Sequence, residues 1–147
     1  MENLKLPKCD LQIKNEEGNQ FVLDIVRKKY VVLTAEEWVR QHFIHLLIDH
    51  LKYPRALIRL ESKFHYFKSG KRSDIIVMDR SMNPFLLVEC KAPDIPIKRT
   101  AINQIAVYNK VLRSKFIALT NGMNHFIWEF SREKYHPLDQ FPEFPRE

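Results

Sequence analysis

The sequence predicts an α/β domain in which a mixed central β-sheet is flanked by α-helices. Two short apolar runs, residues 75–78 and 85–88, have the length and β-rich composition of strands buried on both faces. Two longer segments, residues 35–51 and 100–113, repeat apolar residues at helical spacing. After the first helix the expected order is β-β-β-α-β, which indicates helices and strands packed in layers.

Composition bounds the class of protein. A chain of 147 residues suits a single domain, and 45% hydrophobic with 29% charged residues excludes global disorder. No apolar run is long enough to span a membrane, and the first residues lack the apolar core of a signal peptide. With only two cysteines, we expect a cytoplasmic protein without a disulfide framework. The net charge of +6 suits a polyanionic partner.

The N-terminal part, residues 1–33, is expected to hold a β-hairpin. Its strands are predicted at residues 11–15 and 21–26, with the turn residues Asn15, Gly18 and Asn19 between them. Residues 30–33 are predicted to be an extended lead-in to the first helix.

The predicted core spans residues 34–130, and residues 131–147 are expected to form a surface tail. Thr34 as N-cap and Glu37 three residues later fit a capping box at the start of the first helix. Strands are then predicted at residues 59–67, at the two apolar runs, and finally at residues 116–120 and 125–130, where an Asn121-Gly122 turn joins the last pair.

Three charged residues occupy the apolar strands, where an unpaired charge is costly. Asp74 begins the first run, and Glu89 and Lys91 follow the second. Because side chains alternate along a strand, Glu89 and Lys91 share one face, whereas Cys90 turns into the core. Two carboxylates suit a hydrated Mg²⁺ ion, which is usually held by one or two protein carboxylates together with water and phosphate oxygens.

These residues resemble the PD-(D/E)xK nucleases and, more narrowly, the N-terminal nuclease domain of type I restriction enzyme R subunits. Three pieces carry the resemblance over residues 34–130: RSDIIV, LLVECKAP and NQIAVYNKVL. The resemblance implies a restriction-endonuclease-like fold and a metal-dependent deoxyribonuclease that hydrolyses phosphodiester bonds with Mg²⁺ or Mn²⁺. It also implies DNA and other restriction-modification subunits as partners.

The resemblance assigns a role to each site residue. Asp74 and Glu89 are the expected metal ligands, and Lys91 orients or helps to deprotonate the attacking water, or stabilises the developing charge. A glutamate of the first helix is the expected third acid; we favour Glu36 over Glu37 because Glu37 has a capping role and Glu36 lies on the face that points at the sheet. One metal ion or two remain equally open.

The expected DNA contacts surround this site. Gln104 and Tyr108 match the QxxxY motif of the family and lie four residues apart on the second helix. A rim of cations is predicted from the flanks of the two strands: Lys68, Lys71, Arg72, Lys98 and Arg99. Such residues position a phosphate backbone and identify bases weakly.

Other interpretations remain beside this one. In one of them, Asp74 with Arg72 and Glu89 with Lys91 are purely structural ion pairs. In another, the chain is an inactive DNA-binding or assembly module that keeps the basic clusters and the QxxxY helix. The sequence contains only three glycines and no P-loop, so neither a nucleotide site nor the motor that follows this domain in type I R subunits is expected. The six histidines show no zinc-binding spacing.

Overall fold

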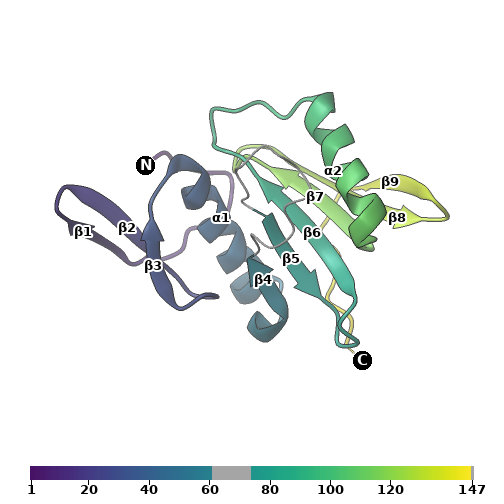
Figure 1. Cartoon of the computed structure of the whole chain (residues 1–147), viewed down its shortest axis with the longest axis horizontal. Helices are drawn as coiled ribbons and strands as arrows, with labels where there is room; N and C mark the ends of the chain where they lie inside the picture. The colour runs from purple at the N-terminus through teal and green to yellow at the C-terminus, as the bar shows by residue number, and fades with distance from the viewer. Residues whose placement is uncertain (61–73, 147) are drawn as a thin grey trace.

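The computed structural model describes residues 1–60 and 74–146, which form two sheets and two α-helices (Figure 1). The larger sheet has the strand order β4-β5-β6-β7-β8-β9. Its strands are β4 (Ile58–Leu60), β5 (Asp74–Met78), β6 (Pro84–Cys90), β7 (Phe116–Thr120), β8 (His125–Ser131) and β9 (Lys134–Leu138). The β6–β7 pair is parallel and the other pairs are antiparallel, so the sheet is mixed, as predicted.

The two helices cover opposite faces of the large sheet. Helix α1 (Ala35–His45) continues into a π-helical turn, η1 (Leu46–His50), which together confirm the predicted first helix. Helix α2 (Arg99–Leu112) is the crossover between the parallel strands β6 and β7, and it ends where Arg113 adopts a left-handed conformation with φ of 56°. Adjacent parallel strands require such a crossover connection, and α2 supplies it.

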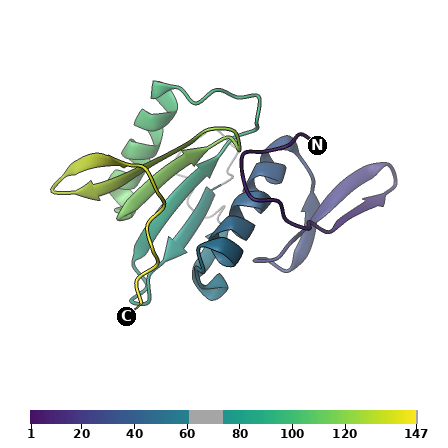
Figure 2. The same ribbon diagram turned by 180° about the vertical axis from the view of Figure 1, so that it is seen from behind.

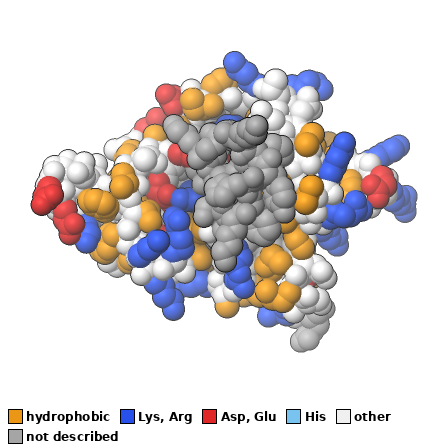
Figure 3. All heavy atoms as spheres, in the orientation of Figure 1, with side chains coloured by type: hydrophobic (Ala, Val, Ile, Leu, Met, Phe, Trp, Pro, Cys, Tyr) orange, Lys and Arg blue, Asp and Glu red, His pale blue; other side chains and the backbone are white. Residues whose placement is uncertain are grey.

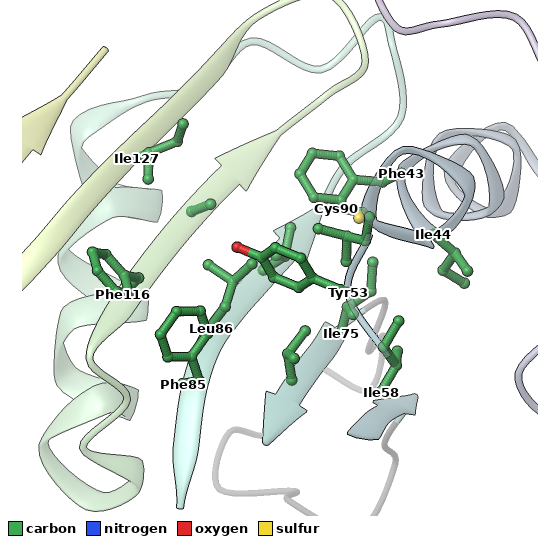
Figure 4. Close-up of a cluster of buried hydrophobic side chains, with 14 of the residues drawn as sticks. Phe43, Ile44, Tyr53, Ile58, Ile75, Phe85, Leu86, Cys90, Phe116 and Ile127 are labelled. Carbon is green, nitrogen blue, oxygen red and sulfur yellow. The ribbon is translucent and has the colours of Figure 1, made fainter. Parts of the chain in front are cut away.

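Strict alternation along β5 and β6 divides the core into two clusters. Ile75 and Val88 face α1 and pack with its Phe43, in the cluster drawn in Figure 4. Ile76 and Leu87 face α2 and pack with its Ile105. Each of these side chains is at most 2% exposed, so the two apolar runs are strands buried on both faces, as predicted.

The N-terminal segment forms a separate three-stranded antiparallel sheet beside α1 (Figures 1 and 2). Strands β1 (Ile13–Glu16) and β2 (Asn19–Asp24) confirm the predicted hairpin, with Gly18 at a φ of 82° in the turn. The predicted extended lead-in is a third strand, β3 (Lys29–Val32), which pairs with β2. Its residues give no clear alternation of burial, which explains why the sequence did not reveal it.

The C-terminal segment corrects one prediction. Residues 134–138 were expected in a surface tail, but they form β9, the edge strand that pairs with β8. Beyond it, Phe141 packs edge-on against Phe43, with ring centroids 5.2 Å apart, and Phe144 packs against Tyr53 and Phe85. The Tyr53 hydroxyl donates a hydrogen bond to the Pro142 carbonyl, so the segment is part of the core on the α1 face.

The predicted strand at 59–67 is confirmed only where β4 covers it, because the rest lies outside the described residues. The predicted rim residues Lys68, Lys71 and Arg72 lie there too. In residues 1–60 and 74–146, no helix has the length and apolarity that crossing a membrane requires.

We expect Phe141→Ala to lower the free energy of unfolding by about 2 to 3 kcal/mol, because it leaves a void against the fully buried Phe43. Phe126→Ala is the matched control, since Phe126 is 43% exposed and should cost less than about 1 kcal/mol. Urea unfolding measures both values. Equal losses in the two variants would show that residues 139–146 do not stabilise the core.

Candidate functional site

The site residues gather where β5 begins and β6 ends. Positions 74 and 89 are direct partners in the antiparallel β5–β6 ladder. Paired positions of such a ladder lie on the same face, with β-carbons about 5 Å apart. The sequence positions that carry Asp74 and Glu89 are therefore neighbours in the fold, although fourteen residues separate them in the chain.

Glu89 and Lys91 lie on the α2 face of the sheet. The Lys91 Nζ atom is 3.7 Å from the nearer carboxylate oxygen of Glu89, and the two side chains are 25% and 22% exposed. Cys90, between them, is 2% exposed and packs in the cluster under α1. The predicted alternation is thus confirmed, and the two charged groups lie at the boundary between core and solvent.

The loop after β6 is fixed over this end of the sheet. The Lys91 backbone N–H extends the ladder by donating to the Thr120 carbonyl at 2.8 Å. Asn121 is 2% exposed, and its side-chain amide donates to the Ile95 carbonyl at 2.8 Å, while its oxygen accepts from the N–H groups of Met123 and Asn124. One buried asparagine therefore holds both the β7–β8 turn and the loop.

This loop and the first turns of α2 border a shallow, solvent-open hollow of about 300 Å³. Three of the predicted site residues line it: Lys91, Lys98 and Gln104. The remaining lining is Ile95, Pro96, Thr100 and Ala101. Two cations, Lys91 and Lys98, line the hollow, and the Glu89 carboxylate lies 3.7 Å from the Lys91 ammonium.

The QxxxY pair has two different environments. Gln104 is exposed at the hollow, whereas Tyr108, one turn further along α2, is 4% exposed and packs with Leu87 and Ile117. Arg99, the first residue of α2, is exposed beside Lys98. Lys98 and Gln104 therefore share the hollow, Arg99 is exposed but does not line it, and Tyr108 is buried.

The two acids at the start of α1 also differ. Thr34 Oγ1 accepts a hydrogen bond from the Glu37 N–H at 2.9 Å, which confirms Thr34 as the N-cap, the first half of the predicted capping box. The Glu37 carboxylate is buried and accepts hydrogen bonds from Arg40 and Gln41. Glu36 is half-buried in the first turn. Glu37 thus has a structural role, while the assignment of Glu36 as a third metal ligand stays a prediction.

Arg40 and Gln41 are buried polar partners of Glu37 that the sequence analysis did not predict. Burial opposes the charge of Arg40, but hydrogen bonding and Coulomb attraction from Glu37 outweigh it, so the pKa of the guanidinium is raised above its ordinary value. Arg27 links this group to the N-terminal sheet, because it bonds to Asp24 at 2.6 Å and lies 3.9 Å from Glu37. The sequence does hold one signal for these residues, because Arg40 and Gln41 are polar residues at buried positions of the predicted first helix.

The arrangement of the chain defines the class of protein. A mixed sheet between two helices, with an acid on one strand paired to a Glu-x-Lys triplet on the next, is a restriction-endonuclease-like fold. A family model for the type I restriction enzyme R protein N terminus (HSDR_N) matches residues 35–142, and the chain belongs to that family. This membership suggests a nuclease-like function. Neither the curated proteins nor the solved structures contain a match to the chain.

We expect Asn121→Asp to release the loop while keeping the turn. The aspartate still accepts from the Met123 and Asn124 N–H groups, but it presents an oxygen to the Ile95 carbonyl in place of a donor. Amide exchange at Ile95, whose N–H bonds to Ala92, should accelerate roughly tenfold for about 1.4 kcal/mol lost. Exchange at Lys91 is the internal reference, and the exposed Asn124→Asp is the control variant. Unchanged exchange at Ile95 would contradict this role of Asn121.

Proposed function

We propose that this chain is a metal-dependent DNA endonuclease domain that hydrolyses phosphodiester bonds. The observation that supports it most is the direct pairing of positions 74 and 89, with Lys91 on the same strand face as Glu89. Two acids at paired positions of a mostly apolar sheet repel each other unless a cation lies between them. A bound metal ion would explain why both acids are present.

The donor set fits a magnesium ion. Among the described residues, no group of three or more His, Cys, Asp or Glu side chains could hold a metal. Mg²⁺ needs only one or two carboxylates and keeps several waters, and Glu89 lies at the solvent boundary where waters can reach it. Asp74 and Glu89 would hold the ion, with Glu36 as an outer ligand. When bound, the ion would neutralise the phosphate and acidify a water.

The chain's own residues would perform the remaining steps. The Lys91 ammonium, held 3.7 Å from Glu89, lies where it can donate a hydrogen bond to a phosphate oxygen or to the attacking water. Lys98 and Gln104, across the hollow, would fix the neighbouring part of the phosphate backbone. Tyr108, packed beneath Gln104, would support the helix at this point.

An inactive DNA-binding or assembly module of the same fold is the second candidate. The ion pair between Glu89 and Lys91 supports it, since two opposite charges at this separation already offset each other's desolvation in part. Such a module would keep the basic hollow and would need no metal.

We expect Glu89→Gln and Lys91→Met each to reduce Mg²⁺-dependent nicking of supercoiled plasmid by at least about a hundredfold, because each removes a charge next to the reacting phosphate. Glu129→Gln and Lys115→Met are control variants with the same charge changes elsewhere on the sheet. Urea unfolding checks that all four remain folded. Nicking that persists in EDTA, or in Glu89→Gln, would refute the proposal. A wild type that neither nicks nor releases heat on Mn²⁺ titration would identify the inactive module.

A second pair of variants tests the choice of helix acid. Glu36→Gln should lower nicking by about tenfold or more and change the free energy of unfolding by less than about 0.5 kcal/mol. Glu37→Gln should instead cost about 3 kcal/mol of stability, because it leaves the buried Arg40 without its counter-charge. Plasmid nicking and urea unfolding separate the two effects. A stability loss in Glu36→Gln with normal nicking would reverse the assignment.

A further inference from the structure

A second basic groove lies outside the candidate site, between the N-terminal sheet and the edge of the large sheet. It is lined by Lys28 from the β2–β3 turn, and by Arg55 and Arg59 from η2 (Arg55–Leu57) and β4. Val26, Ala56 and Ile58 form its floor, and its volume is about 380 Å³. In Figure 3, Lys and Arg side chains gather between the N-terminal sheet and the grey residues.

Among the described residues, the cations of this groove, Lys28, Arg55 and Arg59, form no ion pair with an acid. Arg27, their neighbour, is neutralised by Asp24 and Glu37. Three like charges around one concave surface repel one another and raise the local positive potential, which a polyanion would relieve.

The β2–β3 turn that presents Lys28 is firmly built. Asp24, which is fully buried, accepts hydrogen bonds from the Val26 and Arg27 N–H groups and from the Arg27 side chain. The Lys28 N–H closes the turn by donating to the Asp24 carbonyl at 2.8 Å. Lys28 itself has a left-handed φ of 58°, a conformation that asparagine adopts more readily than lysine. The turn therefore carries its positive charge at a conformational cost.

The groove begins next to the candidate site. Arg59 pairs with Ile76 on β5, two residues along from position 74 and on the same face of the sheet. Strand spacing and rise place the α-carbons of positions 59 and 74 about 8 Å apart. The Arg59 guanidinium donates to the Ala56 carbonyl at 2.6 Å, which directs it toward η2 and away from the site. Position 59 on β4 thus lies beside the site, while the Arg59 side chain belongs to the groove.

We propose that this groove, formed by Lys28, Arg55 and Arg59, binds the phosphate backbone of the same DNA duplex whose scissile phosphate lies at Glu89 and Lys91. The inference rests on the proposed function for the path of the duplex. It gives the N-terminal sheet, which precedes the family match at residue 35, the role of extending the grip on DNA. The contacts are to phosphates, so they add affinity and no sequence preference.

The test compares two triple variants in fluorescence anisotropy with a labelled duplex, in EDTA so that no cleavage occurs. The groove variant is Lys28→Asn, Arg55→Gln and Arg59→Gln. Asparagine is chosen at position 28 because it adopts the left-handed backbone conformation of this residue readily. The control removes three exposed cations from the far part of the fold: Lys110→Gln, Lys115→Gln and Lys134→Gln. If each groove cation contacts one phosphate, the slope of log K against log salt becomes about 2.7 units less steep in the groove variant. The control should keep the wild-type slope.

Three results would overturn the inference, provided that urea unfolding shows both variants folded. These are a wild-type salt slope in the groove variant, equal flattening in both variants, and a loss of binding to anionic lipid vesicles with duplex binding intact. Glu89→Gln in the same assay separates this inference from the proposed function, because it should bind normally and fail to nick. If Glu89→Gln still nicks plasmid, the proposed function fails while the groove is still judged by its salt slope.

Discussion

The site depends on the alternation of side chains along β6, which is buried on both faces. Because β6 pairs with β5 on one side and β7 on the other, its register cannot slip without moving Leu87 and Val88 to the wrong clusters. The same constraint fixes Cys90 under α1 and places Glu89 and Lys91 on the α2 face at the strand's end. The apolar core thereby positions the polar groups, and the two charged side chains need no other scaffold to share a face.

Several charged side chains are buried in this fold, and the chain offsets the cost of burying them by pairing. Asp24 is fully buried, and Glu37 and Arg40 are each 7% exposed, so each would be strongly destabilising alone. Arg27 joins Asp24 to Glu37, and Glu37 in turn binds Arg40 and Gln41. This network couples the N-terminal sheet to the first turns of α1. The small sheet, which buries little apolar surface of its own, is held to the domain by this network together with Ile25 and Val26, which pack against the cluster under α1.

The sequence predicted what depends on local pattern. Apolar runs gave β5 and β6, helical spacing gave α1 and α2, and strand parity gave the separation of Glu89 from Cys90. Strands β3 and β9 were not predicted, because their residues alternate poorly and they are strands through pairing with β2 and β8. The packing of Phe141 on Phe43 joins segments nearly a hundred residues apart, and the bond from Asn121 to Ile95 depends on where a loop returns. Such contacts leave no periodic signal in the chain.

The positions of the charges suggest how grip and chemistry are divided between parts of the fold. Glu89 and Lys91 are only about a quarter exposed, at the end of a rigid strand, so a group that they contact is held in one geometry. Lys28, Arg55, Lys98 and Arg99 are exposed on turns and helix ends at the periphery. A contact made equally in the ground state and the transition state lowers the dissociation constant and leaves the chemical step unchanged. Peripheral cations of this kind can therefore change in number and placement without altering the geometry at β6.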